Sequence, residues 1–150
     1  MLRQALLLSA VVLFANPVAA KERMDEPQAI AEIERLGGQV ERDEEAPNEP
    51  VVAVRFTKSN SFSDADVATL RSFHSLSRLY LGKSKITDVG LAGIARLENL
   101  TELDLVHTAI TDAGMKQLRA LPNLALLSLS FTKLTDVGAR RSAGSIRSLG

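Results

Sequence analysis

Three threonine-aspartate pairs recur every 24 residues and are the first groups whose types and spacing could do chemistry. They are Thr87-Asp88, Thr111-Asp112 and Thr135-Asp136, in the phrases ITDVG, ITDAG and LTDVG. Stacked carboxylates could line a row of cations, but calcium takes six or more oxygens, and no second acidic residue recurs at a fixed offset. At a helix start, threonine accepts from free N–H groups and aspartate favours the positive end of the dipole. We therefore interpret the pairs as helix caps and predict no metal.

Residues suited to catalysis are sparse. His74 and His107 are the two histidines, and the chain has no cysteine. The histidines fall at non-equivalent repeat positions, so they do not form the helical pair that a metal site would need. The sequence also contains no G-x-S-x-G elbow and no phosphate-binding loop. We predict a protein that is not an enzyme and holds no cofactor.

The recurring phrase belongs to a longer unit that must position these residues. Aligned from Leu76, Leu100 and Leu124, three registers carry Leu or Ile at relative positions 1, 4, 6 and 11. Pairs such as Leu79 and Leu81 flank a polar residue, as in a short strand, while later apolar residues recur every three positions, as on a helix. Each unit is therefore predicted to contain a strand, a turn and a helix.

One such unit cannot bury its own apolar side, so the units must stack. A weaker unit begins at Val51, with Val54 and Phe56 at positions 4 and 6, which brings the total to about four. Stacking strand on strand and helix on helix predicts an α/β solenoid. Because strands lie closer together than helices, the parallel sheet is expected on the concave face and the helices on the convex face.

The pattern resembles the leucine-rich repeat, L-x-x-L-x-L-x-x-N/C-x-L, over roughly residues 51–146. The L-x-x-L-x-L-x-x-T-x-I-T-D-x-G-L form resembles the repeats of exported bacterial leucine-rich-repeat proteins, and more loosely the ribonuclease-inhibitor-like class. The position that holds Asn or Cys in the family is Ser84, Thr108 and Thr132 here. The resemblance implies that this buried side chain satisfies backbone groups at the turn, which a hydroxyl does with fewer bonds than an amide.

The segments before the repeats have different compositions. Arg3, the apolar run ALLLSAVVLFA and the small residues of Val18-Ala19-Ala20 are typical of a signal peptide, so residues 1–20 are expected to be cleaved and the protein exported. Residues 21–50 are expected to form a capping helix from Pro27 to Leu36, ended by Gly37-Gly38, followed by a solvated acidic loop from Glu41 to Glu49.

The last unit of the repeat domain, residues 51–150, is degenerate. Ala139, Ser142 and Ser145 replace the apolar helix residues of the earlier units, as truncation or a shifted reading frame would explain. We therefore predict a fraying C-terminus. Leu118 and Leu127 are then expected near an apolar end that is open to self-association.

Outward-facing strand and turn positions are the candidate ligand-binding site, because they have no role in the core. These candidates are Arg55, Arg78, Tyr80, Glu102, Asp104, His107 and Ser128. Along the stack they run from basic to acidic to uncharged. Arg and Tyr are common interface anchors.

The net charge of the two parts of the chain argues against one class of partner, nucleic acids. Residues 21–50 hold four basic and ten acidic residues, a net charge of −6, and residues 51–150 hold thirteen and eight, a net charge of +5. This excess is too weak for nucleic-acid binding, which uses a clustered basic stripe. We expect no membrane span after signal cleavage. The sequence favours a protein-binding scaffold. The alternatives are an envelope-associated spacer without a specific ligand and an adaptor that delivers substrate to a partner enzyme.

Overall fold

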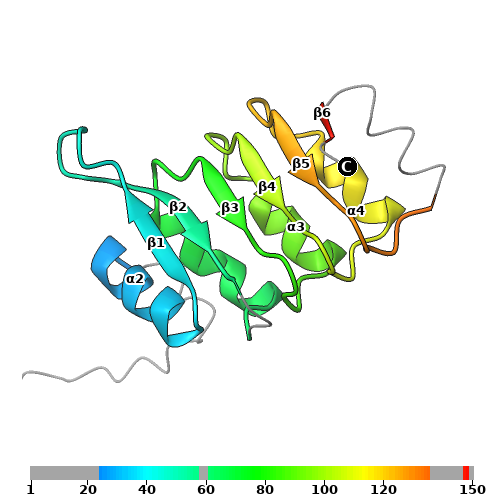
Figure 1. Ribbon diagram of the computed structural model, residues 1–150, viewed down its shortest axis with the longest axis horizontal. Coiled ribbons are helices and arrows are strands. Elements are labelled where there is room, and N and C mark those ends of the chain that lie inside the picture. Colours follow the sequence, from blue (N-terminus) through cyan, green and yellow to red (C-terminus); the bar gives the residue numbers. More distant parts are fainter. Residues whose placement is uncertain (1–23, 58–60, 136–146, 149–150) are drawn as a thin grey trace, which may run out of the picture.

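The chain forms one mixed α/β layer structure built on a mostly parallel sheet (Figure 1). The computed structural model describes residues 24–57, 61–135 and 147–148. Within these residues the sheet has six strands in the order of the sequence. The strands are β1 (Gln39–Arg42), β2 (Val51–Arg55), β3 (Arg78–Tyr80), β4 (Glu102–Asp104), β5 (Leu126–Ser128) and β6 (Arg147–Ser148). From β2 to β6 neighbours are parallel, whereas β1 is antiparallel to β2.

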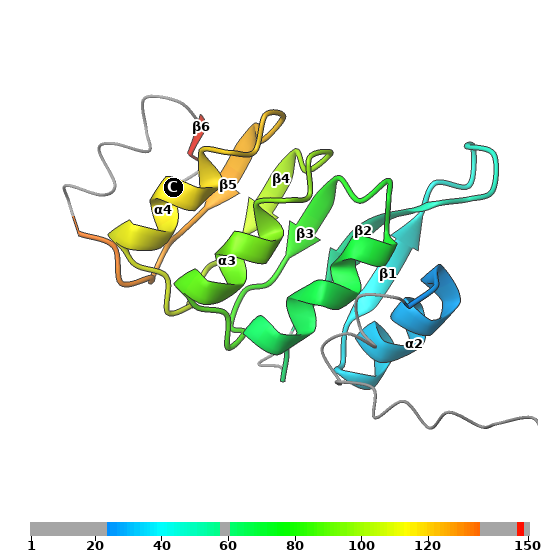
Figure 2. The same ribbon diagram turned by 180° about the vertical axis from the view of Figure 1, so that it is seen from behind.

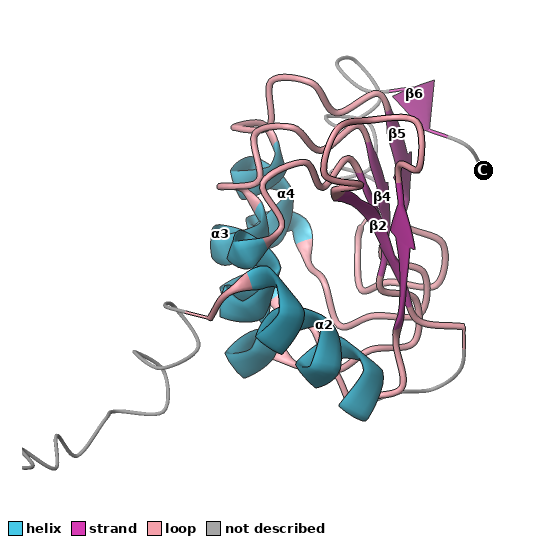
Figure 3. Cartoon of the chain, turned by 90° about the vertical axis from the view of Figure 1, so that its left-hand side faces the viewer, coloured by secondary structure: helices cyan, strands magenta, loops and turns pink. Residues whose placement is uncertain are grey.

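The helices lie on one side of this sheet (Figures 2 and 3). They are α2 (Glu26–Arg35), the 3-10 helix η1 (Asp64–Ser72), α3 (Asp88–Ile94) and α4 (Asp112–Leu118). Each of β2, β3 and β4 is followed by one of the last three helices, as the predicted strand–turn–helix unit requires. No described helix covers the other side of β2 to β5, which we call the open face.

The core lies between the two layers and is made by the same position of each unit. Val54 pairs with Leu79, Leu79 with Leu103 and Leu103 with Leu127, and all four side chains are at most 3% exposed. Residues on either side of the three central leucines are only half-buried, so each short strand alternates as expected. Burying one leucine contributes about 2 kcal/mol, and this row therefore holds the strands in register.

The N-terminal helix packs against one end of the core. Asp25 caps α2 by accepting from the Gln28 N–H at 2.9 Å, and the helix ends before Gly37, whose φ is +86°. A left-handed backbone of this kind costs glycine little, which explains the stop. Ala29 and Ile33 are fully buried.

The segment after α2 differs from the expectation of a wholly solvated acidic loop. Glu41 and Arg42 belong to β1, which pairs with β2. The expectation was wrong for these two residues. Their charged side chains indicated a loop. The segment is nevertheless a strand, because pairing with Val51–Arg55 supplies the backbone bonds that hold it in the sheet.

The first unit departs from the others in its helix. Val67, Leu70 and Phe73 are buried as predicted, but η1 is a 3-10 helix instead of an α-helix. At its start Asp66 accepts from the N–H and the hydroxyl of Ser63, at 3.0 and 2.8 Å. In this capping box the hydrogen-bonding groups at the start of η1 find their partners within the same unit.

The apolar core is better covered at the C-terminal end than the sequence implied. The last predicted strand, Leu127 to Leu129, is found one residue earlier, and β6 pairs with β5. Leu118 is fully buried and Leu127 is 3% exposed, so neither forms an open apolar surface. The degenerate residues 139–145 and the predicted signal peptide lie outside the described residues, and self-association stays a prediction.

Candidate functional site

The open face brings most of the sequence-predicted site residues into two rows. Residues that pair in register across β2 to β5 stand side by side. One row is Ala53, Arg78, Glu102 and Leu126, and the other is Arg55, Tyr80, Asp104 and Ser128. Six of the seven predicted residues therefore share one surface, as expected for alternate positions on parallel strands.

A charged network occupies the end of this surface nearest β1. Glu41 accepts from Arg55 at 3.2 Å and from Arg78 at 3.1 Å, using a different oxygen for each. The Arg55 guanidinium carbon also lies 4.2 Å from the centroid of the Tyr80 ring, a cation–π contact. Glu41 was missed as a site residue, because only the antiparallel pairing of β1 places it beside the two arginines.

Tyr80 links this network to the next strand. Its hydroxyl donates to Glu102 Oε2 at 2.7 Å. Burial raises the pKa of Tyr80, and the hydrogen bond and negative charge of Glu102 raise that pKa further, while Arg55 and Arg78 lower it. Because ionisation would place a second anion beside Glu102, the phenol keeps its proton and its role as donor.

The other end of the open face carries a carboxylate and an aromatic pair. Asp104 Oδ1 accepts from the Val106 N–H at 2.9 Å. His107 lies in the turn after β4, where its ring stacks on Phe131 with 4.4 Å between centroids and 4° between planes. Phe131 is 76% exposed. Ser128 lies beside Asp104 in the sheet register.

The turns after three successive strands share an uncommon backbone conformation. Lys83, His107 and Phe131 each occupy the same repeat position, with φ of 60°, 56° and 58°. The Lys83 N–H donates to the Val106 carbonyl and the His107 N–H to the Ser130 carbonyl, at 2.8 and 3.0 Å. These bonds between turns fix the left-handed residues and hence the direction in which their side chains leave the backbone.

The position-9 hydroxyls lie just inside these turns. Thr108 and Thr132 donate to the carbonyls of Leu105 and Leu129, at 2.6 and 2.8 Å, as the resemblance implied. The Ser84 hydroxyl is buried and has no hydrogen-bond partner among the described residues.

On the helix side, the threonine-aspartate pairs do more than cap. Thr87 and Thr111 accept from the N–H groups of Val89 and Ala113, at 3.3 and 3.2 Å, which confirms the predicted caps. Asp64 also accepts from the N–H and hydroxyl of Thr87, at 2.8 and 2.6 Å. The carboxylate of one unit thus binds the cap of the next, a link that the sequence analysis missed.

The same link recurs in the following units. Asp88 accepts from Thr111 in this way, and Asp112 accepts from both groups of Thr135. Most oxygens of these carboxylates are therefore already acceptors, which disfavours their use as a cation row. Among the described residues there is no cluster of three or more potential metal ligands.

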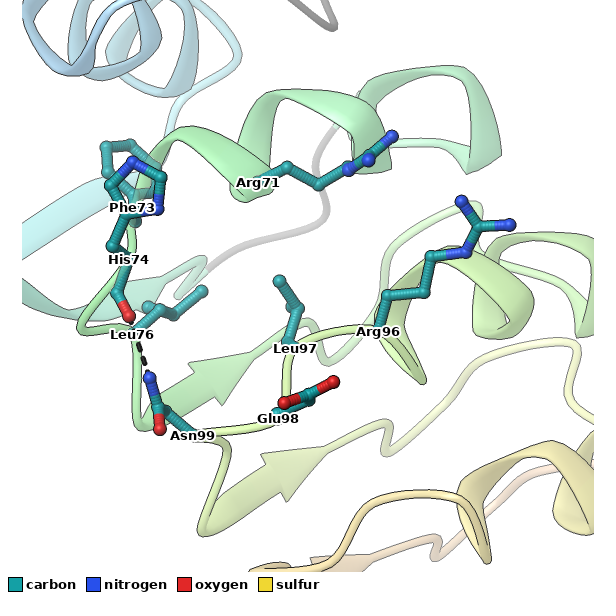
Figure 4. Close-up of a pocket in the computed structure, with 8 residues that line it drawn as sticks. All are labelled: Arg71, Phe73, His74, Leu76, Arg96, Leu97, Glu98 and Asn99. Atoms are coloured by element: carbon teal, nitrogen blue, oxygen red, sulfur yellow. Dashed lines mark hydrogen bonds between the residues drawn. The ribbon is translucent and has the colours of Figure 1, made fainter.

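A groove lies on the helix side, where η1 and α3 and the turns after them come together (Figure 4). It is about 270 Å³ in volume and is bordered by Arg71, His74, Arg96 and Asn99. The Asn99 side chain donates to the His74 carbonyl at 2.8 Å and joins its two walls. Arg71, in η1, and Arg96, in the turn after α3, both line the groove, as does Glu98. This groove is shallow and has a mixed charge, which makes it a weaker candidate than the open face.

Comparison with known proteins agrees with the repeat architecture. A family model described as Leucine Rich repeat matches residues 96–118, from just after α3 through β4 to the end of α4. No curated protein matches the chain. In the described part of the chain, none of the helices has the length and apolar character needed to cross a bilayer. The match supports a leucine-rich-repeat protein and a binding scaffold in general terms.

Proposed function

We propose that the chain is a non-enzymatic protein-binding scaffold, a short leucine-rich-repeat solenoid of the 24-residue ITDxGL type. Its concave surface is the open face of β2 to β5. The observation that carries the proposal is the pre-assembled side-chain network on that face, which runs from Glu41 through Arg55 and Tyr80 to Glu102.

Two properties of the network suit protein recognition. Tyr and Arg are enriched among residues that dominate binding energy, and both lie on this face, in β2 and β3. Their side chains are already held by neighbours, so less conformational entropy is lost when a partner binds.

A recovery experiment tests the proposal. The purified chain and an Arg78→Ala/Tyr80→Ala/Asp104→Ala variant are used as bait in an extract of the cell envelope. Arg96→Ala, on the helix side, serves as the matched control. We expect a protein that is retained by the wild type and the control but lost from the triple variant, with thermal unfolding showing that all three baits are folded.

A spacer without a specific ligand is the second candidate function. The ion pairs of Glu41 with Arg55 and Arg78 favour it, because a face whose charges are paired internally needs no partner. Equal recovery by the wild type and the triple variant would select this alternative and defeat the scaffold.

Export is also a proposal, and it rests on the N-terminal sequence. Leu7→Arg places a charge in the apolar run, which costs about 3 kcal/mol at the centre of such a segment. We expect the variant to accumulate uncleaved in the cytoplasm. Mature protein beginning at Lys21 in this variant would contradict the signal peptide, and Lys21→Gln, just beyond the cleavage site, is a control that should still be processed.

A further inference from the structure

The two halves of the open face differ in how far their charges are paired. In the half nearest β1, Arg55 and Arg78 both pair with Glu41. The other half is formed by Glu102, Asp104, His107 and Phe131, and we call it the acidic-aromatic half. Lys83 occupies the same repeat position as His107 and Phe131, so the face holds three cations and three carboxylates, which are unevenly distributed over the two halves.

In the acidic-aromatic half Glu102 accepts from the Tyr80 hydroxyl, whereas no described side chain binds the carboxylate of Asp104. Its neighbours in register are Tyr80 and Ser128, which are uncharged, and Lys83 in the preceding turn forms no ion pair among the described residues. The Val106 N–H occupies Oδ1, and this bond also fixes the direction of the carboxylate. Asp104 is thus an oriented acceptor with an oxygen left for a cation.

The aromatic pair adds an apolar contact next to this acceptor. Phe131 is 76% exposed, and the parallel His107 ring supports one side of it. Both residues are in left-handed turns, and the His107 N–H joins the two turns by donating to the Ser130 carbonyl. His107 follows Asp104 by three residues, so their Cα atoms lie at most about 11 Å apart, and closer because the chain turns between them. Two side chains of an extended peptide, two or three residues apart, span this distance.

We infer that the acidic-aromatic half receives a segment of a partner protein that carries a lysine or arginine two or three residues from an aromatic or large aliphatic side chain. The cation pairs with Asp104 and the apolar side chain packs on Phe131. This inference rests on the proposed scaffold function and specifies the chemistry of its partner. Complementary charge gives orientation and specificity, and the desolvated aromatic contact supplies most of the affinity.

Selection from a random dodecapeptide phage library against the purified chain tests the inference. The selected peptides are synthesised and their dissociation constants measured by calorimetry. We expect peptides that combine a basic residue with a nearby aromatic or aliphatic one. Asp104→Asn keeps the acceptor for Val106 but loses the charge, and it should weaken binding about tenfold, as should Phe131→Ala. Raising the salt concentration should weaken wild-type binding and leave the Asp104→Asn complex less affected.

Two controls distinguish a failure of this inference from a failure of the proposed scaffold function. Val89 is 74% exposed on α3, so Val89→Ala removes a similarly exposed, smaller apolar group from the other side of the molecule and should not change affinity. Acidic peptides whose binding is lost in Arg78→Ala would overturn the inference but leave the scaffold function intact. If no peptide is selected, or if affinity does not respond to any open-face substitution, both proposals are overturned.

Discussion

Asp88 accepts two hydrogen bonds from Thr111, from its N–H at 2.9 Å and from its hydroxyl at 2.6 Å. Thr111 in turn accepts from the Ala113 N–H and caps α4. One aspartate therefore orders the start of the helix in the next unit. The Thr-Asp pair of the repeated ITDxG motif therefore joins neighbouring units as well as capping a helix. The free energy of unfolding should depend on these bonds.

Removing the carboxylate should cost more than a dipole interaction alone. Asp88→Asn loses the charge and one of the two acceptor oxygens, and hydrogen bonds to a charged group contribute about 1.5–3 kcal/mol. Since Asp88 is half-buried, we expect the free energy of unfolding to fall by about 1–2 kcal/mol in urea denaturation. Glu98→Gln, at an exposed position, is the control. A loss of only a few tenths would mean that Asp88 acts on the helix dipole alone.

The Thr111 hydroxyl donates to Asp88 and accepts from Ala113, and two substitutions test what these bonds contribute together. Thr111→Ser keeps a hydroxyl that both donates to Asp88 and accepts from Ala113, whereas Thr111→Ala loses both bonds. We expect Thr111→Ala to lower the free energy of unfolding by about 1–2 kcal/mol and Thr111→Ser to cost only a fraction of that. Equal destabilisation by both would show that the methyl group, not the hydroxyl, matters.

Gly114 leaves room for the Asp88 carboxylate to bind Thr111. A Cβ at Gly114 would lie 2.3 Å from Asp88 Oδ1 and 2.8 Å from Leu91 Cδ1, so the carboxylate would have to move away from Thr111. We expect Gly114→Ala to destabilise the fold by about 1–3 kcal/mol, as overpacking does. Gly82→Ala is a matched control, because its Cβ would meet no atom closer than 3.5 Å. A neutral Gly114→Ala in thermal unfolding would argue against a rigid link.

Tyr80 is the one tyrosine in the chain, so its titration can be followed directly by phenolate absorbance. Burial and Glu102 raise its pKa, so it should ionise above the ordinary value of about 10. Glu102→Gln removes the negative charge and should lower this pKa, while Arg55→Ala should raise it. Titration at the ordinary value in the wild type would contradict the Tyr80–Glu102 contact.

The same shift predicts how stability depends on alkaline pH. A pKa that is higher in the folded state than in the unfolded state means that folding is favoured while the phenol is protonated. This contribution is complete below about pH 10 and is lost as the pH rises through the folded-state pKa. Tyr80→Phe should therefore lose less stability than the wild type between neutral and strongly alkaline pH, as chemical denaturation at each pH would measure.

The sequence predicted those parts of the fold that depend on periodic apolar residues. Leu79, Leu103 and Leu127 were assigned to strands because each is followed by a polar residue and then by a second leucine, and the core confirms this. The start of α4 was predicted from Thr111, because a cap is a local property of the chain.

Other features depend on contacts between distant segments, and the sequence did not predict them. Glu41 joins the open face only through pairing of β1 with β2, while its own neighbours are charged and read as loop. The bond from Thr87 to Asp64 joins residues 23 positions apart, and the spacing alone does not show which helix start faces which carboxylate. The stacking of His107 on Phe131 likewise requires the left-handed turns.

Because each link has the same geometry, one whole unit of 24 residues could be deleted without changing how the remaining units join. Deleting residues 100–123 would bring Thr135 to the position that Thr111 holds relative to Asp88, and Leu127 to that of Leu103 beside Leu79. The shortened chain would keep its joints and core register but would lack Glu102, Asp104 and His107. Gain or loss of whole units by recombination could therefore exchange the recognition surface while the remaining scaffold stays folded, which would allow partner choice to evolve separately from stability.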